Sequence, residues 1–215
     1  MKTLSRRSAV EPFHAMDVLA EATKRREAGY PVISMAVGQP SHPAPKAALE
    51  AARTALAHGR LGYTDALGTN SLKIAIAKHY KTRYGIEVDP QRIAVTTGSS
   101  AGFNLAFLAL FDPGDCVAIA RPGYPAYRNI LAALGLTVVE VEANAGTGFT
   151  LTPESLAAAE KKAGRRLDGV LLASPANPTG TVTGKAGLKA LADYCHERGI
   201  AFISDEIYHG LTFAG

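Results

Sequence analysis

Polar or aromatic side chains follow each of four apolar runs of the sequence. After the first run comes the stretch TGSSAGF. Gly98, Ser99 and Ser100 stand there, directly after the apolar run at 92–97. The glycine permits a tight turn, and either serine can cap a helix that begins at this point. Free N–H groups at a helix N-terminus bind anions, and neighbouring hydroxyls suit a phosphate. A plain helix cap explains the same residues, so both interpretations stay open.

Two further runs are followed by an aromatic ring and by an amide. Tyr124 lies in PGYPAY after the run at 116–120, where its ring could stack on a flat ligand or pack at a domain edge. Asn177 lies in SPANPTG after the run at 169–174. The prolines of this loop restrict its backbone, so the carboxamide loses little further entropy when it makes a contact. A turn closed by the asparagine side chain is the alternative.

The fourth run ends in a carboxylate. Asp205 closes the run at 200–205, and Tyr208 and His209 follow it. A carboxylate at the end of a buried strand needs a cationic partner, which an arginine, a helix N-terminus or a ligand can supply. A metal pair of Asp205 and His209 is disfavoured, because their spacing requires a helix and this stretch predicts a strand and then a loop.

The elements that must hold these residues alternate along the chain. Apolar periodicity and turn residues predict helices at 14–28, 45–57, 70–83, 99–111, 124–134, from 153 onward and 185–198, and strands at 31–35, 92–97, 116–120, 136–141, 169–174 and 200–205. This alternation is typical of an α/β fold with a mainly parallel sheet between helical layers. The strands are near-continuous apolar runs, as expected when both sheet faces are covered. Since ligands of such sheets bind at the carboxyl ends of strands, the four sets of residues are expected to converge.

The amino-acid composition and charge of the chain disfavour several classes of function. The chain has 215 residues, a net charge of +4 and 47% hydrophobic residues, which suits one large or two small globular domains. Its basic residues are dispersed, which favours solvated helix faces over a nucleic-acid site. No apolar run approaches the roughly 18 residues of a membrane span. Cys116 and Cys195 show no zinc-type spacing and fit a reducing compartment. We therefore predict a cytoplasmic protein without a nucleic-acid, membrane or metal partner.

One kind of ligand satisfies all four sets of residues, namely a flat, phosphorylated and cationic aromatic molecule. Pyridoxal 5'-phosphate is such a ligand. The Asp205 carboxylate would hold its ring nitrogen protonated through a charge-assisted hydrogen bond. A protonated ring is an electron sink for carbanions, so the sequence predicts chemistry at the α-carbon of an amino acid.

The ordered motifs GQP, YTDALGTNSLKIAIA, VTTGSSAGF, PGYPAY, SPANPTG and SDEIY resemble those of the class I/II, fold-type I aminotransferases of the aspartate aminotransferase superfamily. The resemblance runs from VGQP to SDEIYHGLTF and covers nearly the whole chain. It implies the three-layer α/β/α major domain of PLP-dependent transferases, incomplete in this chain. Residues 1–44 would form an N-terminal arm and the start of a small domain, and residues 45–215 the N-terminal part of the large cofactor-binding domain.

The resemblance also implies a role for each candidate residue. The substrate carboxylate would be bound by the backbone of Gly38 and by Asn177. Tyr63 would cross a homodimer interface to the cofactor phosphate of the partner subunit. Gly98, Ser99 and Ser100 would bind the cofactor phosphate, and Tyr124 would stack on the ring face. Asn177 and Tyr208 would contact the ring oxygen. Asp205 would pair with the ring nitrogen.

The implied activity is transfer of an amino group from an L-amino acid to a 2-oxo acid by a Schiff-base, ping-pong mechanism. The Schiff-base lysine of the family follows the Asp-x-x-Tyr pair, so it is expected beyond Gly215, and this chain is expected to be inert alone. A C–S β-lyase on the same fold is an alternative, because fold does not determine reaction. A non-enzymatic, aminotransferase-like effector domain is another, disfavoured because only about 30 residues precede the run at 31–35.

Overall fold

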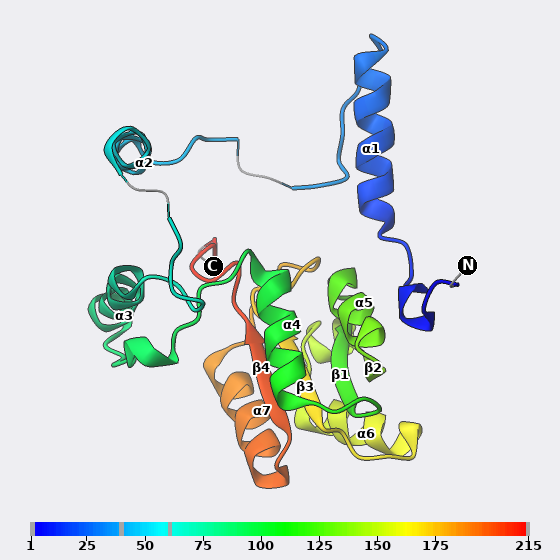
Figure 1. Cartoon of the computed structure of the whole chain (residues 1–215). Coiled ribbons are helices and arrows are strands. Elements are labelled where there is room, and N and C mark those ends of the chain that lie inside the picture. Colours follow the sequence, from blue (N-terminus) through cyan, green and yellow to red (C-terminus); the bar gives the residue numbers. More distant parts are fainter. Residues whose placement is uncertain (1–2, 39–40, 60–61, 214–215) are drawn as a thin grey trace. The chain divides into compact units, whose positions relative to one another are not determined.

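The chain forms two compact units in the computed structural model, which describes residues 3–38, 41–59 and 62–213 (Figure 1). The larger unit combines Met1–Pro12 with Thr97–Gly215, and the smaller unit is Phe13–Thr96. The division into residues 1–44 and 45–215 expected from the family resemblance stays a prediction.

A parallel sheet forms the centre of the larger unit. Its described strands are β1 (Cys116–Arg121), β2 (Thr137–Glu142), β3 (Gly169–Ala173) and β4 (Ala201–Asp205), in the spatial order β2-β1-β3-β4. Every pairing in the sheet is parallel. The helices of this unit are α4 (Ser99–Leu110), α5 (Pro125–Ala133), α6 (Pro153–Ala163) and α7 (Lys185–Arg198), with short 3-10 turns η1 (Arg6–Ser8) and η3 (Ala145–Thr147). The predicted α/β class and parallel sheet are confirmed.

Helices cover both faces of the sheet because successive side chains of a strand point to opposite sides. In β1, Cys116 and Ala118 join a buried cluster with residues of α6 and α7. The intervening Val117 and Ile119 join a second cluster with Phe107 and other residues of α4 and α5. Figure 1 shows α4 and α5 on the near side of the strands. The predicted arrangement of three layers is thereby confirmed.

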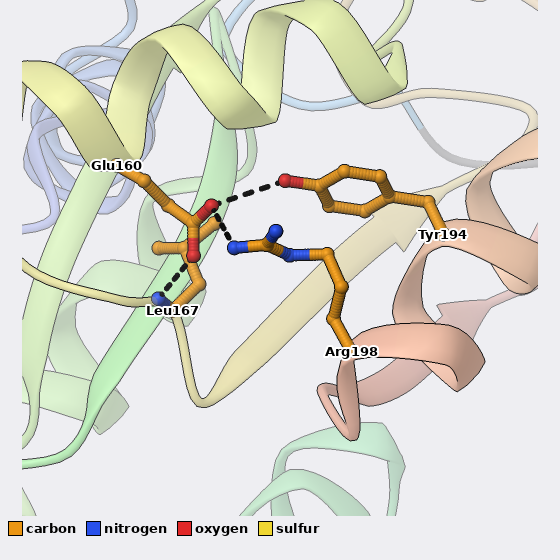
Figure 2. Close-up of polar contacts among 4 residues, drawn as sticks. All are labelled: Glu160, Leu167, Tyr194 and Arg198. Carbon is orange, nitrogen blue, oxygen red and sulfur yellow. Dashed lines mark hydrogen bonds and ion pairs between the residues drawn. The ribbon is translucent and has the colours of Figure 1, made fainter.

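A carboxylate ties the two helices of one layer together. Glu160 of α6 accepts hydrogen bonds from the Leu167 N–H (2.9 Å), the Tyr194 hydroxyl (3.1 Å) and the Arg198 guanidinium (2.6 Å), as Figure 2 shows. Tyr194 and Arg198 belong to α7, and the guanidinium lies 5.1 Å from the centre of the Tyr194 ring. Burial acts to raise the pKa of Glu160, but these donors outweigh it and leave that pKa below its usual value.

The helices of the smaller unit agree with the predicted ones. They are α1 (His14–Glu27), α2 (Lys46–His58) and α3 (Asn70–Tyr84), followed by the short turn η2 (Pro90–Arg92). Gly85 ends α3 in the left-handed conformation that glycine favours. Gln39 and Pro40 of the GQP motif lie outside the described residues.

Two predicted strands, at 31–35 and 92–97, are wrong. A strand needs a hydrogen-bonded neighbour, and within the described parts of the chain neither segment has a strand beside it. The Val95 N–H donates instead to the Leu67 carbonyl in a loop (3.0 Å). Ile33 and Met35 are almost fully exposed. Both segments have the amino-acid composition of a strand, but composition alone does not provide a neighbouring strand for hydrogen bonding.

Candidate cofactor-binding site

The carboxyl ends of the parallel strands lie at one edge of the sheet, where three of the predicted site residues stand. Asp205 is the last residue of β4, Tyr124 follows β1, and Asn177 follows β3. Helix α4 runs back to the start of β1 through the short loop 111–115, so it begins at this same edge (Figure 1). The predicted convergence at the edge is therefore present in the larger unit.

Asp205 is a buried carboxylate with neutral donors on both oxygens. It is 9% exposed. The Tyr127 hydroxyl donates to Oδ2 over 2.5 Å, and the Ile207 N–H donates to Oδ1 over 3.0 Å. No arginine or lysine among the described residues forms an ion pair with this carboxylate. A buried carboxylate of this kind can receive a cation from a ligand.

Tyr127 is the site residue that the sequence analysis missed. Its ring is 4% exposed and packs edge to face against Tyr124 (5.4 Å between ring centres) and Phe103 (5.2 Å). Burial, and then the hydrogen bond to Asp205, raise the pKa of its phenol above the ordinary value. One signal could have found it: Tyr127 follows Tyr124 by three residues, which places both on one side of the first turn of α5.

Asn177 and Tyr208 line one cavity of about 570 Å³. The loop that carries Asn177 is closed by backbone hydrogen bonds, from the Ala176 N–H to the Thr181 carbonyl (2.9 Å) and from the Gly180 N–H to the Ala176 carbonyl (2.7 Å). Because backbone groups close the loop, the Asn177 carboxamide is not needed for the turn. The peptide bonds before Pro175 and Pro178 in this loop are cis.

A glycine, and not one of the two serines, is the N-cap of α4. Gly98 is the N-cap residue, with φ of 88°, and as a glycine it offers no side chain to cap the helix. Ser99 and Ser100 are the first two helical residues, and both are exposed. Of the two interpretations left open for these serines, the helix cap is not observed, because the N-cap position has a backbone conformation that glycine adopts and serine rarely does. An uncapped first turn leaves N–H groups available to an anion.

Gly38 and Tyr63 belong to the smaller unit, and both are exposed there. Among the described residues, no group of three or more histidine, cysteine or acidic side chains could hold a metal ion. The described helices include none that is both long and apolar enough to cross a bilayer.

Comparison with known proteins identifies the family. The model of the family "Aminotransferase class I and II" matches residues 30–215. This chain belongs to the class I and II aminotransferases. Members of that family depend on pyridoxal phosphate.

The chain is similar to several named enzymes. It is 48% identical over 209 residues to a valine–pyruvate aminotransferase of Mycobacterium tuberculosis. The aligned region covers 97% of the chain and 53% of that enzyme. It is 36% identical over 217 residues to an aspartate/prephenate aminotransferase of Thermus thermophilus, covering 100% of the chain and 55% of the relative. The chain thus spans about half the length of these relatives.

Solved structures show the same fold. A crystal structure of an aminotransferase from Mycobacterium tuberculosis superposes with a TM-score of 0.94 at 46% identity, over 100% of the chain and 55% of that structure. The aspartate aminotransferase of Thermus thermophilus with maleate gives a TM-score of 0.91 at 36% identity, over 100% of the chain and 56% of that structure. The chain therefore has the α/β architecture of the matching half of these structures.

Proposed function

We propose that this chain forms the cofactor-holding part of a PLP-dependent aminotransferase that moves an amino group from an L-amino acid to a 2-oxo acid. The observation that carries the proposal is Asp205. Its carboxylate is buried at the carboxyl edge of the sheet, and no cationic side chain among the described residues pairs with it. A protonated pyridine nitrogen is the kind of cation that such a carboxylate stabilises.

The residues around Asp205 suit the rest of the ring. Tyr124, half-buried at the start of α5, offers an aromatic face for stacking. Asn177 and Tyr208 line a common cavity and would donate to the phenolic oxygen of the ring. When bound, the protonated cofactor would withdraw electrons from the substrate carbon that loses its proton. The role of this chain would be to keep the ring nitrogen protonated and in position beside Asp205.

The phosphate would bind at the start of α4. Gly98 begins the helix without a side-chain cap, and the hydroxyls of Ser99 and Ser100 belong to its first turn. Backbone N–H groups and the helix dipole favour an anion at this place. These features support a phosphate site at the sheet edge that also carries Asp205.

The substrate and the second subunit complete the proposal. The backbone of Gly38 and the carboxamide of Asn177 would bind the substrate carboxylate. Tyr63 is fully exposed in the smaller unit, which leaves its hydroxyl available to the cofactor phosphate of a second copy in a homodimer. Valine with pyruvate is the first substrate pair to assay, because a relative 48% identical to this chain carries those substrates in its name.

The reactive amine would come from another part of the full-length enzyme. Lys161 and Lys162 lie on α6, Lys185 and Lys189 lie on α7, and all four are exposed. None of them lines the cavity that contains Asn177 and Tyr208 among the described residues. A lysine outside these helices would take the proton from the substrate and return it.

Substitution of Asp205 tests the proposed function. In the full-length enzyme, we expect Asp205→Ala to lower kcat by at least about 100-fold, the scale of losing one placed electrostatic group. Asp193→Ala is the matched control, because Asp193 is an exposed carboxylate on α7 that pairs with Lys189. This control should keep the wild-type rate. A wild-type rate in Asp205→Ala would refute the assignment of Asp205 to the ring nitrogen.

A further inference from the structure

Tyr127 joins three parts of the candidate site that lie far apart in the sequence. Its hydroxyl donates to Asp205 of β4, 78 residues away, over 2.5 Å. Its ring packs against Tyr124, whose centre lies 5.4 Å away. Tyr127 also lines a small cavity of about 20 Å³ together with Asn177. One side chain thus contacts the carboxylate and the aromatic face, and it borders the loop that carries the amide.

The position of the Tyr127 hydroxyl is restricted by two aromatic neighbours of its ring. The ring centre of Phe103 on α4 lies 5.2 Å away at an interplanar angle of 79°, and that of Tyr124 lies 5.4 Å away at 81°. The ring is 4% exposed, so it has little freedom to turn away. The hydroxyl therefore reaches a defined point on Asp205 before any ligand arrives.

The hydrogen-bond pattern leaves Asp205 able to bind a further donor. Tyr127 occupies one lone pair of Oδ2, and the Ile207 N–H occupies one lone pair of Oδ1. Each carboxylate oxygen can accept two hydrogen bonds, so acceptor capacity remains on both. Burial raises the pKa of the Tyr127 phenol, which therefore keeps its proton and remains a donor at neutral pH.

We propose that Tyr127 is a positioning residue for the cofactor ring, and that it acts through Asp205. By holding Oδ2, its hydroxyl sets the direction in which the carboxylate meets the ring nitrogen. The inference rests on the proposed function, since it presumes that the ring nitrogen faces Asp205. It assigns to the hydroxyl a role distinct from the packing role of the ring.

Binding of pyridoxamine 5'-phosphate tests the inference without a measurement of turnover. This molecule carries the ring and phosphate of the cofactor but has no aldehyde, so it forms no bond to a lysine. Its Kd is measured by equilibrium dialysis with full-length wild-type enzyme, Tyr127→Phe, Asp205→Ala and the double variant. Phenylalanine keeps the ring packed against Phe103 and Tyr124 and removes only the hydroxyl.

We expect Tyr127→Phe to weaken binding about tenfold (about 1.4 kcal/mol) in the wild-type background, the lower end for a hydrogen bond to a charged group. In the Asp205→Ala background, the same change should weaken binding less than about twofold, because the hydroxyl then has no carboxylate to hold. Non-additivity of this kind is the signature of action through Asp205.

Tyr194→Phe is the matched control, because Tyr194 also donates to a carboxylate, Glu160 (3.1 Å), in a different part of the unit. It should leave the Kd unchanged. Equal losses for Tyr127→Phe in both backgrounds, no loss in the wild-type background, a similar loss in Tyr194→Phe, or failure of Tyr127→Phe to fold would each overturn the positioning role. If wild-type enzyme does not bind pyridoxamine phosphate, the proposed function itself fails.

Discussion

Glu160 offers a prediction about stability that follows from its three hydrogen bonds. Its side chain is 11% exposed, and its carboxylate links α6 to α7 and to the backbone of Leu167, two residues before β3 (Figure 2). We consider Glu160→Gln, which keeps the shape of the side chain and removes its charge. The amide oxygen can still accept a hydrogen bond from the Leu167 N–H. The amide nitrogen, which cannot accept, then faces the Tyr194 and Arg198 donors, so both lose their acceptor.

The expected loss in the free energy of unfolding is about 2 kcal/mol at pH 7. Hydrogen bonds to a charged group contribute roughly 1.5–3 kcal/mol when the group is largely buried. Arg198 is 42% exposed, so solvent screens its share and the backbone and tyrosine donors account for most of the effect. For a domain of this size, such a loss lowers Tm by roughly 4–8 °C.

The pH dependence has a defined sign. The pKa of Glu160 in the folded chain lies below its ordinary value of 4.5. Its stabilisation is therefore complete above the unfolded pKa and is lost as the pH falls through the lower, folded pKa. Since glutamine does not titrate, the difference between wild type and Glu160→Gln should be full at pH 7 and should shrink below about pH 4.5.

Urea unfolding of wild type and variant at pH 7, 5.5 and 4, followed by circular dichroism, measures this difference. Glu197→Gln is the matched control: Glu197 is exposed on the same helix as Arg198 and beside it in sequence. Its effect should stay within about 0.5 kcal/mol. An effect of Glu160→Gln no larger than that of Glu197→Gln at pH 7, or one that does not diminish at pH 4, would refute the reasoning.

Two further predictions concern packing and activity. A Cβ added in Gly169→Ala would overlap the Phe111 ring, so we expect the free energy of unfolding, measured with urea, to fall by about 1–3 kcal/mol. The loss in Gly184→Ala, where no atom lies within 4 Å of the added Cβ, should be smaller. Equal losses in the two variants would contradict the packing argument. We also expect the purified 215-residue chain to show no transamination of valine with pyruvate, because its described cavity contains no lysine. Formation of alanine in that assay would overturn this expectation.

Local sequence was sufficient where burial or capping alone decides the structure. The strands β1, β2, β3 and β4 agree with the predicted runs. The two central strands, β1 and β3, are largely apolar because they are covered on both faces. The helix predicted from 153 onward is also present as α6, and Thr152 caps it through reciprocal hydrogen bonds with Ser155. These features depend on neighbours a few residues away, so they can be found in a single sequence.

Pairing between distant segments was beyond local sequence. The segments 31–35 and 92–97 have strand composition but no strand neighbour among the described residues, and only a neighbour makes an extended segment a strand. The sequence allowed a serine to cap α4, because hydroxyls are the usual caps. The backbone angle of 88° at Gly98 selects glycine instead, and that angle is set by the loop as it folds.

For the candidate site, the sequence by itself determined which chemical groups stand after each strand, including the Asp205 carboxylate and the Asn177 amide. It also determined that they share an edge, because the carboxyl ends of parallel strands meet there. The tertiary structure alone decided how Asp205 is held. Its donor Tyr127 is 78 residues away in sequence, and a hydrogen bond over that separation exists only after α5 packs on the sheet.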